Sequence, residues 1–423
     1  MVHVVFAIPF AMENTLRFAR AASTLPGVQL SVVSQDRLQS FPEDFRQRLA
    51  GFEQVADGMN ADHIAAGVVK LQHRVAKVER LLGILEPLQE PLAAVREQLQ
   101  IRGMGANTSS KFRDKALMKE AFRKEGIPCA GHRLCGTVEE AEQFGREVGY
   151  PLVGKPPAGA GAKATSRCND EVELREFLMS VRPQPGNEIL LEEFVQGREY
   201  SFDSITLHGQ HVFHNICCYN PTPLEVMDNP WIQWCVVLPR DLDQPQFAEI
   251  HSVGPKALDA LGMWTGMSHM EWFRRHDGSI AISEVAARPP GAQFTALMGH
   301  VLGVDMHRVF AELMIYERLP PLERRYSAGA AYLRGQALAQ STSQLDGGAS
   351  SGDRQMIIRA VHGLESVQRD FGEFIVEGKL PQVGQPQAST YEGDGFLIVR
   401  HPDGEFVQDA VQQIVSRVRV EVG

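Results

Sequence analysis

The sequence predicts a protein of mixed α/β and α+β architecture with three domains, and its 423 residues leave room for them. The first observation is a βαβ unit, in which the apolar run Val2–Ile8, a helix pattern at Glu13–Ser23 and the apolar run Val28–Val33 follow one another. Such a unit has parallel strands and a right-handed crossover. The second observation is a β-hairpin pattern in Met267–Gly291, which lies among further strands and helices of an α+β region.

The composition and charge are those of a soluble globular protein. The chain is 43% hydrophobic and 22% charged, and its formal net charge of -10 argues against nucleic acid or an anionic membrane as the main partner. The first residues lack the features of a secretory signal, and no apolar run reaches the roughly 20 residues that span a bilayer. The six cysteines form no C-x-x-C pair. We therefore expect reduced thiols and a cytoplasmic protein.

Residues 1–107 are assigned to a small N-terminal α/β domain. No G-x-G-x-x-G motif follows the first strand, so the fingerprint of a dinucleotide site is absent from it. A helical pattern covers about residues 60–82, Pro87 and Pro91 interrupt it, and Leu92–Leu99 resumes it. Taken alone, this domain indicates little about function.

The next region begins with helices. Helix-start residues at Asn107–Ser110 precede a helix at Lys111–Glu125, and a capping box at Thr137 opens the helix Val138–Val148. Lys115, near the start of the first helix, is either a ligand-binding lysine or an ordinary solvated one.

Lys155 lies on a predicted strand, Tyr150–Pro156, which the glycine-rich segment Pro157–Lys163 (PAGAGAK) follows. Without bulky side chains, such a loop can bring backbone N–H groups close to phosphates, and the lysine adds positive charge. The loop does not match the P-loop motif G-x-x-x-x-G-K-[ST]. A flexible surface turn is the equally weighted alternative.

Acidic residues mark the following strands. Glu192 and Glu193 lie on the predicted strand Ile189–Val195, and Glu199 lies near the start of the next strand, Arg198–Thr206. A strand edge can recognise adenine with its backbone groups, and a carboxylate can accept hydrogen bonds from ribose hydroxyls. Exposed acids at strand ends are the alternative for each of these residues.

The region before the hairpin continues with a strand at His211–Tyr219 and a helix at Phe247–Leu261. Between them, Asn220–Trp234 is predicted to be a proline-rich loop. Its two tryptophans, Trp231 and Trp234, are either core anchors or pocket walls, and core anchoring is the more common role.

The last part of the chain contains a helical segment and a small C-terminal α/β domain, residues 331–423. The helical segment Gln293–Arg318 is divided at Gly303, and the polar stretch Gln340–Asp353 is either a mobile loop or a linker. The expected elements of the end domain are strands at Arg354–Val361, Phe374–Val376 and Gly395–Arg400 and a helix at Ala410–Arg419.

The hairpin carries the strongest functional signal. A two-residue type I′ turn at Asp277-Gly278 would set Glu271 directly opposite Glu284. Like charges in this position repel, but a cation between them removes the penalty, and Mg²⁺ is held by one or two carboxylates together with substrate phosphates. Arg288 shares the face of Glu284 and can clamp a phosphate or carboxylate. Two exposed glutamates are the alternative, and a slip of one residue would separate them.

Five stretches resemble the ATP-grasp superfamily in type, order and spacing, namely FRDKALMK, YPLVGKPPAGAGAK, LLEEFVQGREYS, MSHMEWF and ISEVAARPPG. Within the superfamily, EVAARPPG is most similar to L-amino-acid ligases and related carboxylate–amine ligases. The resemblance implies an ATP-grasp domain at residues 108–330, with a small lid lobe at about 115–195 and a larger lobe at about 196–330. A Rossmann-like pre-ATP-grasp domain at 1–107 would precede it, and the small α/β domain at 331–423 would follow.

The resemblance also implies a role for each candidate residue. ATP would be bound by Lys115, Lys155, Ala158, Gly159, Gly161, Lys163, Glu192, Glu193, Val195 and Glu199. The lysines and the loop would contact phosphates, Glu192, Glu193 and Val195 the adenine, and Glu199 the ribose. Glu271 and Glu284 would ligate Mg²⁺, with Mn²⁺ as a second candidate. Arg288 would be the catalytic residue that faces the acyl phosphate or the substrate carboxylate.

The chain departs from the superfamily pattern at two places. Many members have Asn two residues after the second metal glutamate, where this chain has Ala286, which cannot ligate a metal. Since His269 lies opposite Ala286 in the same register, we hypothesise that His269 or water supplies the missing ligand. In the lid, Ala162 and Ala164 stand where Ser and Gly are frequent, and we expect them to stiffen the loop.

The resemblance implies an ATP-dependent ligase that activates a carboxylate, that of an amino acid foremost, as an acyl phosphate and joins it to an amine. The expected partners are small-molecule carboxylate and amine substrates and a second copy in a homodimer, with neither nucleic acid nor membrane. Specificity is expected in residues 217–234 and in the end domain. One alternative is an ATP-grasp-shaped nucleotide-binding protein without ligase turnover, and another is a ligase with a non-amine acceptor.

Overall fold

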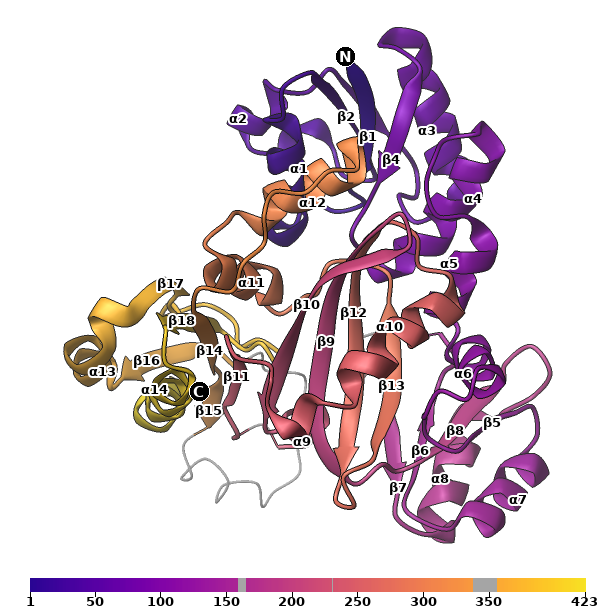
Figure 1. Cartoon of the computed structure of the whole chain (residues 1–423), viewed down its shortest axis with the longest axis vertical. Helices are drawn as coiled ribbons and strands as arrows, with labels where there is room; N and C mark the ends of the chain where they lie inside the picture. Colours follow the sequence, from indigo (N-terminus) through magenta and orange to yellow (C-terminus); the bar gives the residue numbers. More distant parts are fainter. Residues whose placement is uncertain (159–164, 230, 338–355) are drawn as a thin grey trace, which may run out of the picture.

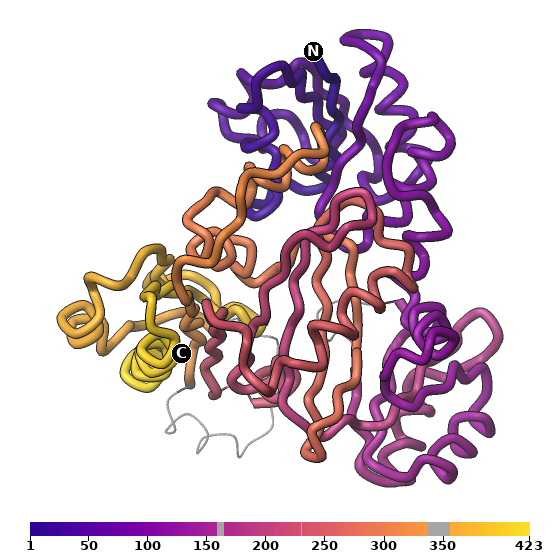
Figure 2. Tube along the Cα trace, in the orientation of Figure 1, coloured from indigo at the N-terminus to yellow at the C-terminus, as the bar shows by residue number. Residues whose placement is uncertain are grey.

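The computed structural model describes residues 1–158, 165–229, 231–337 and 356–423. The N-terminal domain lies at the top of Figure 1, the long strands β9, β10, β12 and β13 lie below it, and a small lobe lies at the lower right. The C-terminal segment, yellow in Figure 2, packs on the opposite side of the long strands from the small lobe. In the described part of the chain, no helix combines the length and the hydropathy needed to cross a membrane.

The N-terminal domain is a parallel sheet of order β3-β2-β1-β4 with helices packed on it. The strands are β1 (Val2–Ala7), β2 (Val28–Ser34), β3 (Gly51–Gln54) and β4 (Val78–Leu82), and the helices are α1 (Glu13–Ser23), α2 (Glu43–Arg46), α3 (Ala61–Arg74) and α4 (Gln89–Leu99). The predicted βαβ unit is therefore confirmed. The helix expected to reach residue 82 was wrong, because α3 ends at Arg74 and Val78–Leu82 forms the edge strand β4. Pro91 lies in the first turn of α4, where proline is tolerated.

The small lobe follows two short helices, α5 (Ala106–Arg113) and α6 (Lys115–Lys124). The prediction of one helix over Lys111–Glu125 was wrong, because Asp114 leaves the helical conformation and caps α6 through the N–H groups of Ala116 and Leu117. In the described residues the lobe is an antiparallel sheet of order β5-β8-β6-β7. Its elements are β5 (His132–Cys135), α7 (Val138–Val148), β6 (Leu152–Lys155), β7 (Ser166–Cys168), α8 (Glu171–Val181) and β8 (Ile189–Glu193).

The large sheet has eight described strands in the order β13-β12-β9-β10-β11-β14-β18-β17. Its strands are β9 (Gly197–Leu207), β10 (Gln210–Asn220), β11 (Trp234–Leu238), β12 (Gly266–Arg275), β13 (Ile280–Ala286), β14 (Ser327–Leu333), β17 (Ile375–Lys379) and β18 (Gly395–His401). The helices along this part are α9 (Pro223–Asp228), α10 (Ile250–Leu261), α11 (Phe294–Leu302) and α12 (Met306–Tyr316). The loop predicted over Asn220–Trp234 was partly wrong, because it contains α9 and because Trp234 begins β11.

The C-terminal segment extends this sheet and adds a second layer. The predicted division at residue 331 falls inside β14, and β18 and β17 continue the sheet beyond it. A further sheet contains β15 (Gly335–Ala337), β16 (Ile358–His362) and β19 (Arg419–Val422), with the helices α13 (Leu364–Phe371) and α14 (Gly404–Arg417). The stretch Gln340–Asp353, expected to be a loop or linker, lies outside the described residues.

Candidate active site

A cavity of about 200 Å³ lies between the small lobe, the hairpin β12–β13 and the segment that follows β13. Nine of the residues singled out from the sequence line it: Lys155, Glu192, Glu193, Val195, Glu199, His269, Glu271, Glu284 and Arg288. Lys115 reaches the same place from α6 through its ammonium group. Of the predicted lid, Ala158 is exposed, and Gly159, Gly161 and Lys163 lie outside the described residues.

The hairpin brings Glu271 and Glu284 together by a route that the sequence did not indicate. The predicted two-residue turn was wrong: Gly278 donates to the carbonyl of Arg275, and Arg275 pairs with Ser279, so three residues form the loop. Only Gly278 among them has positive φ, whereas a type I′ turn needs two such residues. A β-bulge at Ser283 then restores the predicted register, and Glu271 lies opposite Glu284. Without the bulge, Glu284 would lie opposite Met270, on the buried face.

The bulge coincides with a contact on the outer edge of β13. The N–H group of Ile282 donates to the carbonyl of Pro128, at 2.8 Å, in the segment that leads into the small lobe. An edge strand exposes unpaired N–H groups, and this contact satisfies one of them. The segment after α6 therefore holds β13 at the place where its register shifts.

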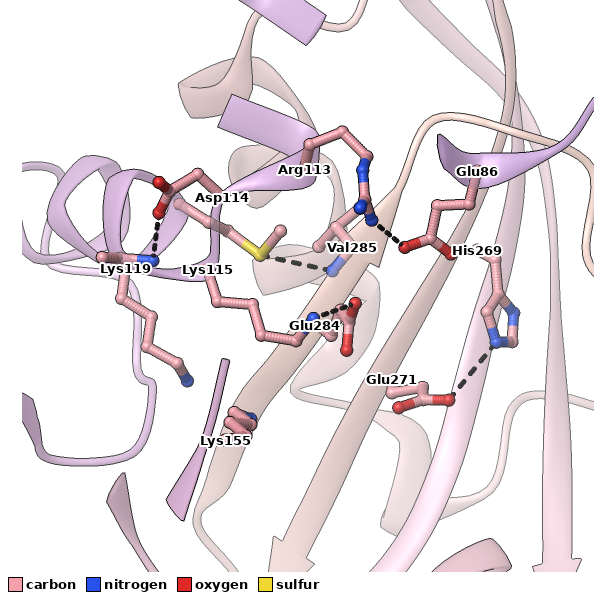
Figure 3. A network of polar contacts seen from close by, with 12 residues as sticks. Glu86, Arg113, Asp114, Lys115, Lys119, Lys155, His269, Glu271, Glu284 and Val285 are labelled. Atoms are coloured by element: carbon pink, nitrogen blue, oxygen red, sulfur yellow. Dashed lines mark hydrogen bonds and ion pairs between the residues drawn. The ribbon is translucent and has the colours of Figure 1, made fainter. Parts of the chain in front are cut away.

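Lys115 neutralises one of the two glutamates. Its Nζ lies 2.8 Å from Oε1 of Glu284, and Figure 3 shows the lysine reaching from α6 to the hairpin. Burial and the neighbouring Glu271 raise the pKa of Glu284 although Lys115 lowers it. Burial also acts on Glu271, but the cations His269, Lys115 and Lys155 outweigh it and hold its pKa below the ordinary value. The two carboxylates therefore repel each other across a space bordered by cations.

Lys155 on β6 lines the same cavity and is paired with Glu192 at 2.9 Å. Lys119, which the sequence reasoning missed, lies 3.3 Å from the other oxygen of Glu192, but those two buried atoms form no hydrogen bond among the described residues. Burial would raise the pKa of Glu192, yet the two lysines lower it to about 2. The spacing of Lys115 and Lys119, four residues apart on α6, was the available signal.

Glu193, Val195 and Glu199 follow one another along the cavity wall. Glu193 pairs with Arg275 at 2.5 Å, and Glu199 is buried beside Glu271, so that burial and this neighbour raise its pKa. Among the described residues, the backbone groups of Val195 make no hydrogen bond. This open backbone edge suits recognition of a planar base.

Arg288 is held by a residue that the sequence reasoning also missed. Its Nε and Nη2 donate to Oε2 of Glu86, at 3.1 and 2.8 Å, while Arg113 donates to Oε1 of the same carboxylate at 2.6 Å. Glu86 lies between β4 and α4, so the N-terminal domain reaches the candidate site (Figure 3). Its carboxylate has an exposed fraction of only 6%, which makes this a buried cluster of two cations and one anion.

His269 lies opposite Ala286, as the register predicted. Its Nδ1 is 2.5 Å from a carboxylate oxygen of Asp203 on β9, and its Nε2 is 3.6 Å from Glu271. Burial lowers the pKa of His269, but Asp203 and Glu271 outweigh it and raise the pKa to about 9. An imidazole whose Nδ1–H is held by a carboxylate has the orientation of a metal-ligating histidine, and Nε2 must first lose its proton.

Aromatic side chains line the other end of the cavity, namely Tyr219, Trp234, Phe294 and Tyr391. Trp234 is both a core residue and a cavity wall, because it stacks on Tyr332 and meets Tyr391 edge-on at 5.0 Å. Residues of the stretch 217–234 and of the end domain therefore border the cavity. Their role in specificity stays a prediction.

The donors around the cavity fit a magnesium ion that is shared with a nucleotide. Within the described ranges, no group of three or more His, Cys, Asp or Glu side chains converges as a metal cage. Two opposed carboxylates are nevertheless what Mg²⁺ takes from a protein when phosphates complete its shell. Within the described part of the chain, the buried ammonium of Lys119 has an ion pair with Glu192 but no hydrogen bond, which is consistent with an anionic ligand nearby.

The comparisons with known proteins agree with this fold. Residues 120–299 match the model of the ATP-grasp domain, so the chain contains an ATP-grasp domain and its fold is the ATP-grasp fold. The expected resemblance to this superfamily is confirmed.

Among named proteins, the chain is similar to amino-acid ligases. It is 25% identical over 228 residues to the L-arginine-specific L-amino acid ligase of Bacillus subtilis, covering 52% of this chain and 54% of that protein. It is 24% identical over 247 residues to the alanine–anticapsin ligase of Bacillus subtilis strain 168, covering 53% and 52%. The crystal structure of an L-amino acid ligase from Bacillus licheniformis superposes with a TM-score of 0.75 at 17% identity, covering 99% of this chain and 98% of that one. The chain spans about half the length of the curated relatives it matches.

Proposed function

We propose that this protein is an ATP-dependent ligase that activates the carboxylate of an amino acid as an acyl phosphate and joins it to an amine, with release of ADP and phosphate. The observation that supports this most is the pairing of Glu271 with Glu284 in one cavity with Lys155 and Arg288. The similarity to two named amino-acid ligases points to the same reaction class.

The proposed reaction needs no nucleophile from the protein, because phosphorylation gives the carboxylate a good leaving group and the amine then attacks it. The chain has to position the reactants and stabilise the negative charge that develops on the transferred phosphoryl group and on the tetrahedral oxyanion. Lys115 and Lys155 would contact the phosphates, as would the segment Ala158–Lys163. Arg288 would face the acyl phosphate or the substrate carboxylate.

The nucleotide would lie along the small lobe. The open backbone edge at Val195 would meet the adenine together with Glu193, and Glu199 would accept hydrogen bonds from the ribose. In this proposal the main role of Glu192 differs from the predicted one. Its carboxylate forms ion pairs with Lys155 and Lys119 and holds both lysines in place, and it would contact only the edge of the adenine ring.

Glu271 and Glu284 would hold Mg²⁺, which neutralises phosphate charge when bound. His269 would contribute Nε2 in place of the asparagine that Ala286 replaces, with Asp203 fixing the ring. Because Mn²⁺ takes the same carboxylate and water ligands as Mg²⁺, Mn²⁺ would also support the reaction. The aromatic end of the cavity would receive the side chain of the substrate amino acid, which favours an apolar one.

An ADP-release screen of amino-acid pairs with ATP and Mg²⁺, read out by product mass, tests the proposal. We expect ADP formation that requires both a carboxylate and an amine, together with a product whose mass is that of the two substrates minus water. Nucleotide binding without turnover for any pair would favour the nucleotide-binding alternative instead. Hydroxylamine traps an acyl phosphate as a hydroxamate. A hydroxamate formed from the carboxylate, with no amide product from any amine, would favour an enzyme that passes the acyl phosphate to another acceptor.

A further inference from the structure

A second cavity, of about 350 Å³, lies on the other side of Arg288 from the candidate active site. Its walls come from the end of β4, from α4, from the segment 102–105 before α5, from the start of β12 and from α12. Figure 1 shows the ends of the long strands meeting the N-terminal domain in this region. The volume falls within the range of about 300–1,000 Å³ that is common for small-molecule sites. Arg288 lines both cavities, so the two share a wall.

The charged lining of this second cavity is mainly cationic. Arg80, Arg96 and Arg102 line it, and Glu317 is the one carboxylate among its described lining residues. Glu317 lies 2.7 Å from Arg102 and 3.6 Å from Arg80. Arg288 already has Glu86 as its counter-ion. The cavity therefore has more positive than negative charge, and an anion would balance it.

Arg96 is the least compensated of these cations. It has an exposed fraction of 6%, and its guanidinium donates to two carbonyls, those of Leu81 and Met104. No carboxylate of the described chain lies within ion-pair distance of it, and burial lowers its pKa to about 10. The backbone of Gly103 covers the side chain, since a Cβ at that position would lie 2.7 Å from Cδ of Arg96. A buried charge without a counter-ion is costly, and a guanidinium has five N–H groups to offer.

The remaining wall is apolar and adaptable. It includes Met263, Met267, Phe310 and Met314, and Trp264 stands at the edge with an exposed fraction of 61%. Methionine side chains adjust to ligands of different shape, and an exposed tryptophan offers a flat apolar face. An occupant of this cavity should thus have an apolar body as well as an anionic head.

We propose that this cavity is a second binding site, for a small carboxylate with an apolar body whose head lies near Arg96 and Arg102. The body would pack against the methionines and Trp264. The site is distinct from the proposed nucleotide and metal residues and does not depend on the proposed reaction. Because Arg288 forms the shared wall, an occupant would touch a residue of the candidate active site.

Binding of 4-phenylbutyrate to the full-length protein without ATP tests the proposal, with the uncharged 4-phenylbutyramide as the matched control ligand. We expect saturable binding of the carboxylate, about tenfold or more tighter than that of the amide, since a hydrogen bond to a charged group is worth about that factor. Arg102→Ala should weaken carboxylate binding by a similar factor. Arg37→Ala, at an exposed arginine outside the cavity, should leave it unchanged.

Two further variants locate the ligand. Trp264→Phe should remove the tryptophan fluorescence change on binding while calorimetry still detects the ligand. Glu284→Gln should bind 4-phenylbutyrate as the wild type does, even if it releases no ADP, so that failure of the proposed function and failure of this site are distinguishable. Equal affinity for acid and amide, an unaffected Arg102→Ala variant, or loss of binding in Glu284→Gln would each overturn the proposal.

Discussion

Glu86 and Arg288 form a two-pronged ion pair although they are 202 positions apart, with Nε and Nη2 of the arginine at 3.1 and 2.8 Å from one carboxylate oxygen. Arg113 contacts the other oxygen. One carboxylate from the N-terminal domain thus fixes the arginine proposed to face the substrate. The same pair implies that a substrate carboxylate reaching Arg288 has to share the guanidinium with Glu86 or displace it.

Glu86→Gln is expected to destabilise the protein by about 3 kcal/mol, because breaking a buried ion pair by removing one charge leaves the other uncompensated. Urea unfolding at neutral pH measures this change. Glu90→Gln, at an exposed glutamate in the next turn, is the control and should unfold like the wild type. Equal stability of the two variants would show that the cluster of Glu86 with its two arginines is not important for folding.

Glu284→Gln is expected to lower ADP release by about 10²–10³, the usual effect of losing one contact that stabilises transition-state charge. The same is expected for Arg288→Ala, and Arg288→Lys should recover little, because lysine lacks the planar fork. Glu176→Gln on the exposed side of α8 controls for the loss of a carboxylate elsewhere. Near-wild-type turnover in both site variants would end the assignment of this cavity as the active site.

His269→Ala is expected to raise the concentration of Mn²⁺ needed for half-maximal ADP release more than that of Mg²⁺, because an imidazole nitrogen binds Mn²⁺ more strongly than it binds Mg²⁺. Ala286→Asn in the His269→Ala background should restore part of the loss by supplying an amide oxygen. Titrations of both metals at fixed ATP measure these shifts. Unchanged metal dependence in His269→Ala would mean that His269 is not a metal ligand and serves only as a positive charge beside Glu271.

Glu192 is expected to make the free energy of unfolding depend on pH in the acidic range. Its pKa is about 2 in the folded protein, against 4.5 for the unperturbed group, so the unfolded chain takes up the proton first as the pH falls. The stabilisation, about 3 kcal/mol, is therefore complete above about pH 5 and is lost progressively towards pH 2. Urea unfolding of the wild type and of Glu192→Gln across this range checks it. The difference between the two proteins should shrink as the pH falls, and a constant difference would contradict the assignment.

Local patterns in the sequence predicted most elements of the fold, because apolar periodicity and caps act over a few residues. The helices Glu13–Ser23 and Val138–Val148 have the predicted bounds. The strand β11 escaped prediction because its five residues follow a proline-rich stretch with little periodicity. Its pairing with β10 and β14 makes it a strand, and such pairing is a tertiary effect.

In the candidate site too, contacts between residues close in sequence were predicted, and contacts between residues far apart in sequence were not. The opposition of Glu271 and Glu284 was predicted correctly, although the turn was wrong, because the bulge shifted the ladder back by one residue. Nothing in the sequence around Glu86 indicates its arginine partners, since the contact depends on how the N-terminal domain meets the hairpin. The roles of the individual residues remain predictions that the variants above address.

The bulge at Ser283 allows the bend of β13 to be changed without changing which residues face each other across the hairpin. Deleting Ser283 would leave Glu271 opposite Glu284 and every pair nearer the turn unchanged, while removing the local bend of β13. A single-residue deletion therefore tests whether the curvature of β13 matters to this protein while Glu271 and Glu284 still face each other. A library of hairpin variants should therefore include a deletion at this position as well as side-chain substitutions.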